Sequence, residues 1–546
     1  MRFVATTLLH RWLLPLLSGA LLMLAYPPFN VSQLGWLAFV PLLFAVEHCR
    51  PGEAFRRGYT AGLLFFGATV WWIIHVSLPG MVALIAFLAL YFGVGAMWFA
   101  ACLSVNRSLS PSPRLRGEGA GAGRPASPAP ADSVLRNLLI AVVASAGWVM
   151  LEWVRGWLLF GGFGWNGLGV SQHQVVPLIQ FASVTGVYGV SALVCFVNIA
   201  FFFTVRRFVR KMTHREPLRR LSWEFYAAMI LSCATFLHGL RLMRHDEPTR
   251  TLRLALVQGN IPQSLKFDPH EKPMILERYR QLTELTVAGK PELIIWPETA
   301  TPEAMRYDIE SFSLVTNLAQ QANAYLLTGT IDVTPMPLLP EAFNTAMLVR
   351  PDGTLDRIYR KIHLVAFGEY VPLRKLVPFM KWLTPITDSF ERGREFTIFE
   401  VDDYRFGAVI CFEDTLPDLY RRFVKRGVDF MVNVTNDAWF KDSPAAEMHL
   451  ANAVFRCAET RRPLVRCTNN GVTCIVSRYG AVPARTRLPA FAEGSLNCEL
   501  ELLHSMPEET FYTRHGDWFV GVCAAVSGVA LVVAWRRRGV AVKSPA

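Results

Sequence analysis

The sequence predicts a multi-span α-helical membrane domain of eight transmembrane helices joined to an α/β layered domain. Apolar residues make up 52% of the chain and charged residues only 18%, whereas about a quarter of an average soluble protein is charged. Long apolar runs fill the first 241 residues and recur near the C-terminus, and β-rich segments alternate with helical ones in between. These observations exclude a wholly soluble protein.

Eight apolar runs are long enough to cross a hydrocarbon core of about 30 Å. The second is at the short limit. The first, flanked by Arg2 and Arg11, lacks a small-residue cleavage site and is followed at once by further spans, so we expect a retained helix and not a signal peptide. The runs are 12–29, 31–47, 58–78, 81–104, 134–154, 183–204, 223–241 and 517–535.

Basic residues are unevenly distributed along the chain. Residues 1–241 contain 19 basic and 7 acidic side chains and the remainder contains 36 of each, so the first part carries the whole net charge of +12. The basic loops fall on alternate sides of the predicted spans, and the positive-inside rule therefore places both termini in the cytoplasm. The charge indicates membrane orientation, and no nucleic-acid partner is expected.

The same patterns divide the chain into three parts. Residues 1–241 are the membrane domain with seven helices, 242–516 form an extracytoplasmic domain of net charge −3, and 517–546 add the eighth helix and a basic cytoplasmic tail. Within the first part, 108–133 holds 19 Ser, Pro, Gly or Ala in 26 positions. Such a composition cannot bury a core, which predicts a disordered cytoplasmic insert.

Strand-like and helix-like segments alternate through the extracytoplasmic domain. Residues 271–288 and 446–460 have helical spacing. This alternation is typical of an α/β layered domain. Strands are expected at 253–258, 292–296, 324–330, 345–350, 406–411 and 428–434.

The ten cysteines form no metal-binding or disulfide framework. Five lie in or beside predicted spans, and the five of the outer domain include no CxxC pair. An odd number of cysteines in an oxidising compartment leaves at least one thiol free. The sequence leaves open whether Cys467 and Cys474 form a disulfide. No metal and no organic cofactor are expected.

Three residues suited to catalysis stand where apolar segments of the outer domain end. Glu298 follows one strand, Cys411 ends another, and Lys361 lies in a basic stretch between them. Side chains at the carboxyl edge of a sheet converge on a crevice. Lys361 and a following helix N-terminus would favour the Cys411 thiolate, and Glu298 could accept its proton. Taken alone, each residue has a structural alternative. Glu298 would be a helix-capping carboxylate, Lys361 a surface cation and Cys411 an inert core thiol.

Together these motifs resemble the nitrilase superfamily, whose Glu-Lys-Cys triad has this chain order in an αββα sandwich, and within it the membrane-embedded apolipoprotein N-acyltransferase family. The resemblance implies that Glu298 is the general base, Lys361 a cationic stabiliser and Cys411 the nucleophile. The matching motifs are LVQGNIPQS at 256–264, IIWPETA at 294–300, HLVAFGEYVP at 363–372, ICFED at 410–414, NVTNDAWF at 433–440 and RCTNNGV at 466–472.

The resemblance also implies further site residues. Glu369, Glu413 and Phe412 are expected to support the triad, Glu369 by orienting Lys361 or the attacking amine. Phe412 stands where the family commonly has Tyr, Phe267 near a usual Trp, and Gly164 in place of a Pro. We expect residues 152–166 to form a wall of the lipid entry path. The alternative interpretation of this segment is an interfacial aromatic belt with a Glu/Arg pair. The residues expected to line a substrate path are Phe267, Arg155, Trp165 and Trp439.

The implied activity is acyl transfer from a membrane phospholipid, through a Cys411 thioester, to the N-terminal α-amine of a diacylglyceryl-cysteine apolipoprotein, which completes lipoprotein maturation. The protein would be a multi-pass monomer of the bacterial inner membrane with a periplasmic catalytic domain. Two alternatives remain: a membrane-tethered nitrilase-type amidase that hydrolyses a C–N bond, and a non-enzymatic transporter or scaffold.

Overall fold

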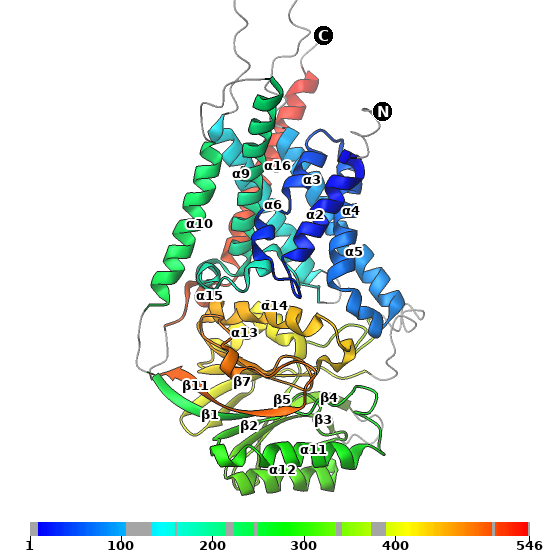
Figure 1. Ribbon diagram of the computed structural model, residues 1–546, viewed down its shortest axis with the longest axis vertical. Helices are drawn as coiled ribbons and strands as arrows, with labels where there is room; N and C mark the ends of the chain where they lie inside the picture. Colours follow the sequence, from blue (N-terminus) through cyan, green and yellow to red (C-terminus); the bar gives the residue numbers. More distant parts are fainter. Residues whose placement is uncertain are drawn as a thin grey trace, which may run out of the picture.

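A helical region and an α/β sandwich are stacked end to end in this protein (Figure 1). The computed structural model describes residues 9–104, 133–158, 161–214, 222–244, 249–334, 341–372, 389–504 and 508–543. The predicted insert 108–133 lies, except for Ser133, outside the described residues.

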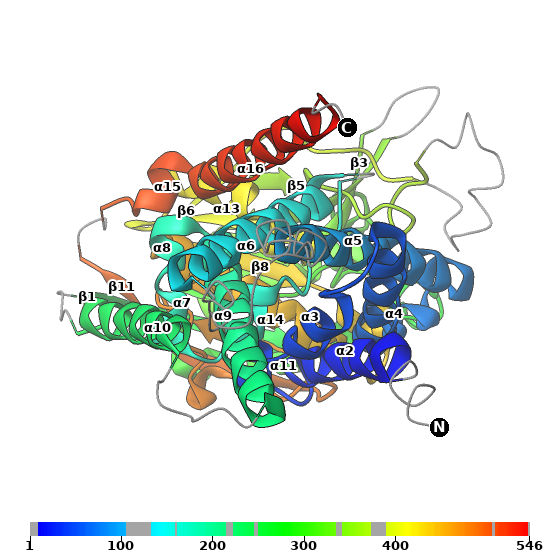
Figure 2. The same ribbon diagram turned by 90° about the horizontal axis from the view of Figure 1, so that it is seen from above.

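Five of the described helices are long and apolar enough to cross a membrane. Viewed from above, α10 and α16 lie at the periphery of the helical region (Figure 2). Of the five, α9 is the most buried and α16 the least, so α16 leaves most of its apolar surface for lipid. The five helices are α5 (Leu78–Ser104), α6 (Val134–Trp157), α9 (Val187–His214), α10 (Trp223–Leu242) and α16 (Trp518–Lys543).

The first three predicted spans differ from the observed helices. The first ends as helix α2 (Leu14–Leu24), because Pro27 and Pro28 lack the backbone donors that a continuing helix needs. The second contains a 3₁₀ turn and then the short helix α3 (Val40–Val46). The third is displaced: α4 (Pro51–Thr69) starts at a proline, which suits the first helical position, and ends nine residues before the predicted limit of 78.

Two sheets form the centre of the sandwich. All six predicted strands are present, and five further strands complete the described sheets. The six-stranded sheet has the order β11-β1-β2-β3-β4-β5 and the five-stranded sheet the order β10-β9-β8-β7-β6. The strands are β1 (Thr249–Gln258), β2 (Leu293–Ile295), β3 (Tyr325–Thr334), β4 (Glu341–Val349), β5 (Leu355–Arg360), β6 (Ile398–Val401), β7 (Tyr404–Ile410), β8 (Phe430–Thr435), β9 (Leu464–Thr468), β10 (Cys474–Val476) and β11 (Gly494–Leu503).

Helices cover both outer faces of the two sheets. Helices α11 (Lys272–Glu284) and α12 (Ile309–Ala322) lie on the side away from the helical region, and α13 (Pro417–Val424) and α14 (Ala445–Thr460) lie between the sheets and that region (Figure 1). The predicted αββα layering is confirmed. It places the second sheet close to the apolar helices.

Alternation along β1 explains how one strand contributes to two cores. Leu254 and Leu256 are buried in the cluster that contains residues of both sheets, whereas Ala255 and Val257 are buried in the cluster that includes α11 and α12. Successive side chains of a strand point to opposite faces, so an apolar run without polar interruption is required when both faces are covered.

Leu254→Ala tests this assignment. Leu254 is 1% exposed, and truncating a buried leucine costs about 2–5 kcal/mol because it leaves a cavity. We expect a clearly lower thermal unfolding midpoint for the detergent-solubilised protein. Leu285→Ala is the matched control, since Leu285 is 71% exposed and its truncation should leave the midpoint within error. Equal midpoints for the two variants would contradict the assignment.

Candidate active site

Glu298 is held at the end of β2 by a close backbone approach. The Trp296 N–H donates to the Leu327 carbonyl (2.8 Å) and the Ala300 N–H to the Gly329 carbonyl (2.8 Å). A Cβ on Gly329 would lie 2.5 Å from the Glu298 Cα, so only glycine permits this packing. The Glu298 side chain is consequently buried.

Lys361 follows β5 and lies between two carboxylates. Its Nζ donates to Glu369 Oε1 (2.8 Å) and lies 3.8 Å from Glu298 Oε1. Lys361 is 1% exposed, and a buried ammonium requires such partners. Glu369 Oε2 also accepts from the Val365 N–H (2.8 Å), which fixes the loop that carries it.

Asn344 joins the two carboxylates and was missed from the sequence. Its Nδ2 donates to Glu298 Oε1 (2.6 Å) and to Glu369 Oε1 (2.9 Å). The Lys361 N–H donates to the Asn344 carbonyl (2.8 Å), so β4 and the end of β5 are tied at the same point. An amide within the buried run 343–349 of β4 was the available signal.

Cys411 lies at a strained turn directly after β7. Its φ is +55°, a left-handed conformation that costs a non-glycine residue free energy and is often found at functional sites. Asn433 on β8 donates from Nδ2 to the Cys411 carbonyl (2.8 Å) and helps to hold this conformation. The residue as a whole is only partly buried.

The electrostatics differ from the sequence-based expectation of a resting thiolate. Burial raises the pKa of the Cys411 thiol, Glu298 raises it further, and the opposing effect of Lys361 is too small to compensate. The expected helix after Cys411 is only the 3₁₀ turn Cys411–Thr415. Burial also raises the pKa of Glu298, against the lowering effect of Lys361. A neutral thiol beside a carboxylate suits proton transfer at the moment of attack.

Glu413 connects the lysine loop to the cysteine strand. Its carboxylate accepts hydrogen bonds from the backbone N–H groups of Ile362 (2.9 Å), His363 (2.8 Å) and Ile410 (2.9 Å), and from the Tyr359 hydroxyl (3.0 Å). Burial raises the pKa of Glu413 to about 7, although these bonds favour its charged form. The position of Cys411 relative to Lys361 therefore depends on Glu413.

The remaining sequence-predicted residues lie in two environments. Phe412 is close to the triad, with its ring 5.5 Å from Lys361 Nζ. Phe267 and Trp439 have side chains that are 46% and 38% exposed. Arg155 and Trp165, by contrast, are buried and joined by a hydrogen bond from Arg155 Nη2 to the Trp165 carbonyl (2.9 Å).

Trp165 forms the junction between the helical region and the cysteine turn. Its indole N–H donates to Thr415 Oγ1 (3.2 Å), and its ring stacks on His449 at 5.1 Å. The sequence reasoning missed His449, whose Nε2 is 2.9 Å from Asp414 and Nδ1 3.1 Å from Asp437. Burial lowers the pKa of His449, but the two aspartates outweigh this and raise it.

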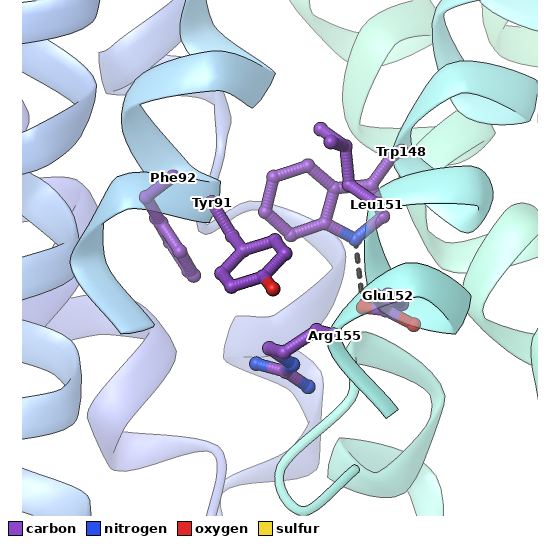
Figure 3. Close-up of a pocket in the computed structure, with 6 residues that line it drawn as sticks. All are labelled: Tyr91, Phe92, Trp148, Leu151, Glu152 and Arg155. Carbon is purple, nitrogen blue, oxygen red and sulfur yellow. Dashed lines mark hydrogen bonds between the residues drawn. The ribbon is translucent and has the colours of Figure 1, made fainter. Parts of the chain in front are cut away.

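A small cavity lies beside Arg155 between α5 and α6 (Figure 3). Its volume is about 10 Å³, which is room for about one water molecule. The Trp148 indole donates to Glu152 Oε1 (2.7 Å), and Glu152 also accepts from the Leu168 N–H (2.7 Å). A cavity of this size is too small for an acyl chain. It is lined by Tyr91, Phe92, Trp148, Leu151, Glu152 and Arg155.

Metal ligands and disulfides are not found in the part of the chain that the structure describes. No group of three or more His, Cys, Asp or Glu side chains there could hold a metal ion. The ten cysteines are free thiols. Cys467, for which a bond to Cys474 had stayed open, instead donates from Sγ to the carbonyls of Val257 and Ile295.

Glu413→Gln tests the connecting role of Glu413. An amide nitrogen cannot accept a hydrogen bond, so at least one of the four donors would lose its partner in the buried surroundings of Glu413, at a cost of about 1–3 kcal/mol. We expect a lower thermal unfolding midpoint. Tyr359→Phe, which removes only one donor and leaves the carboxylate bound by three N–H groups, should have a smaller effect. A Glu413→Gln midpoint at or above that of Tyr359→Phe would contradict this role.

Comparison with known proteins covers both halves of the chain. The family model described as "Apolipoprotein N-acyltransferase N-terminal domain" matches residues 18–200, and the carbon-nitrogen hydrolase model matches 253–502. The solved carbon-nitrogen hydrolase from Helicobacter pylori G27 is 14% identical, with a TM-score of 0.36, over 46% of this chain and 89% of that one.

Relatives of full length are also found. A protein named apolipoprotein N-acyltransferase from Geobacter metallireducens is 34% identical over 97% of this chain and 96% of its own length. One of the same name from Chlorobaculum tepidum is 31% identical over 96% and 97% of the two chains. Similarity of this extent across both regions shows that the chain belongs to the apolipoprotein N-acyltransferase family.

Proposed function

We propose that this multi-pass membrane protein transfers an acyl chain from a membrane phospholipid to the N-terminal α-amine of a diacylglyceryl-cysteine apolipoprotein. The full-length relatives support this activity. The observation that carries it is the hydrogen bond between Trp165, in the helical region, and Thr415, in the turn that begins at Cys411. A nucleophile at this junction can meet substrates that are held in a bilayer.

In the first half-reaction, Cys411 Sγ attacks the carbonyl carbon of a phospholipid ester while Glu298 accepts the thiol proton. Lys361 and the Phe412 N–H stabilise the oxyanion. The C–O bond then breaks, and Glu298 returns the proton to the leaving glycerol oxygen, which releases lysophospholipid. Burial of Glu298 and Lys361 favours this step, because their interactions are stronger away from water.

In the second half-reaction, the acceptor's neutral α-amine attacks the thioester carbonyl. An amide bond forms, the C–S bond breaks, and the amine proton passes through Glu298 to the sulfur. Water must be kept from the thioester for transfer to exceed hydrolysis. Glu369 and Glu413 act as positioning residues through Lys361 and the cysteine turn, while Phe267 and Trp439 contact the acyl chains, and Arg155 and Trp165 form the wall towards the helices.

The proposed arrangement in the membrane has eight crossings and both termini in the cytoplasm. The three-part division into 1–241, 242–516 and 517–546 agrees with the stacking of helices on the sandwich (Figure 1). The excess of basic residues in alternate loops supports a periplasmic catalytic domain. The protein is proposed to act as a monomer in the inner membrane.

Mass spectrometry of protein incubated with phospholipid tests the covalent step. We expect an added acyl mass on Cys411, sensitive to hydroxylamine because thioesters are cleaved by it, and no such mass in Cys411→Ala. Cys498→Ser is the matched control, since Cys498 is a partly buried free thiol on β11 that contributes nothing to the site. A nitrilase-type amidase would instead give no adduct from phospholipid, and full complementation by Cys411→Ala would remove the enzymatic role.

Reporter fusions test the orientation. Alkaline phosphatase, which is active only outside the cytoplasm, should be active when fused after residue 250 and inactive when fused after residue 540. The basic loops between the predicted spans are the physical reason. Activity of the 250 fusion only with a cytoplasmic reporter would reverse the orientation and make a periplasmic lipoprotein acceptor inaccessible.

A further inference from the structure

A second buried lysine, Lys266, reaches the backbone of Glu298 from the loop that follows β1. Lys266 lies between β1 and α11, is 1% exposed, and donates from Nζ to the backbone carbonyl of Glu298 (2.8 Å). The neighbouring Phe267 has an exposed side chain. The loop therefore directs its cation inward and its aromatic ring outward.

The loop is anchored so that Lys266 must enter the site. The Asn260 N–H donates to the Asn469 carbonyl (2.7 Å), and Asn469 exchanges two hydrogen bonds with the backbone of Ile261 through its side-chain amide. Gln263 accepts from Asn436 Nδ2 (2.8 Å). These contacts hold the loop of the first sheet against the strand ends of the second sheet.

A charged donor is more than the carbonyl requires. A neutral amide or hydroxyl would satisfy the same oxygen, whereas burying an ammonium is unfavourable unless a negative charge offsets it. Lys361 is the other cation facing Glu298 among the described residues, and it lies closer to Glu369, at 2.8 Å, than to Glu298, at 3.8 Å. The Asn344 amide, at 2.6 Å from Glu298 Oε1, is a neutral donor, so a second positive charge nearby would further stabilise the buried carboxylate.

We propose that Lys266 is a positioning residue for the catalytic base: it fixes the backbone of Glu298 and, by its positive charge, keeps the Glu298 carboxyl ionised for proton transfer from Cys411. This inference rests on the proposed function. The charged and titratable groups that face Glu298 are Lys361, Glu369, Lys266 and the Cys411 thiol.

Lys266 carries its positive charge in the acidic part of the pH range, where the charge can influence Glu298. Burial lowers the pKa of Lys266 to about 7, with Glu298 opposing the shift, so the ammonium is present in mildly acidic solution. Burial raises the pKa of Glu298, and Lys266 is among the groups that lower it. Removing the charge of Lys266 should raise the pKa of Glu298, which moves the acid limb of activity to higher pH.

Three substitutions separate the charge from the hydrogen bond. Lys266→Gln keeps a donor but no charge, Lys266→Arg keeps both, and Lys266→Met keeps neither. Lys272→Met is the matched control, because Lys272 on α11 is a largely buried lysine paired with Asp308 (2.7 Å) outside the site. The full-length protein in detergent is used, and thermal unfolding verifies that each variant is folded.

Two rates are measured between pH 5 and 9: formation of the acyl-thioester from a phospholipid with a labelled sn-1 chain, and alkylation of Cys411 by iodoacetamide. We expect the acid-limb midpoint of both profiles to rise by about 1 pH unit in Lys266→Gln and Lys266→Met, with about a tenfold loss of rate below the midpoint. Lys266→Arg and Lys272→Met should match the wild type.

A Lys266→Gln midpoint equal to that of the wild type overturns the proposal and leaves Lys266 a structural donor. This variant also decides the matter if Lys266→Met does not fold. Failure of the proposed function is distinguishable, because wild-type protein would then form no thioester from phospholipid, while the alkylation profile would still report on Glu298 and Cys411.

Discussion

The burial of opposite charges at the strand ends is the constraint on which the site depends. Glu298, Lys361 and Glu369 are shielded from water, so each must find its partner within the protein. Lys361 lies between the two carboxylates, and Asn344 donates to both. Displacing any strand that carries one of them would leave a buried charge without compensation, which costs far more than a lost surface ion pair.

Backbone geometry at the site follows from the same need for close packing. Cys411 and Thr299, the residue after Glu298, both have positive φ values, +55° and +46°. Gly329 lets β3 approach Glu298, and Asn433 and Glu413 hold the two sides of the cysteine turn. Strain of this kind persists only where surrounding contacts enforce it, and here those contacts come from β3, from β8 and from the turn after β7.

The junction with the helical region gives the nitrilase-type sandwich its distinctive setting. Trp165 packs on His449 and bonds to Thr415, and His449 is held between Asp414 and Asp437. This chain of contacts connects an apolar helix bundle to the turn that begins at Cys411.

Local patterns in the sequence were sufficient for the apolar helices after residue 78 and for the six predicted strands, because hydrophobic periodicity is a property of neighbouring residues. The structure places Glu298 and Cys411 just after two of these strands and Lys361 after β5, which the sequence analysis did not predict. Only the tertiary structure decided the partners: Asn344 for Glu298, Lys266 for its carbonyl, and His449 for Trp165. It also reversed the expected effect on the Cys411 pKa. Burial and charge pairing arise from atoms that the fold brings together from distant segments, and no local pattern records them.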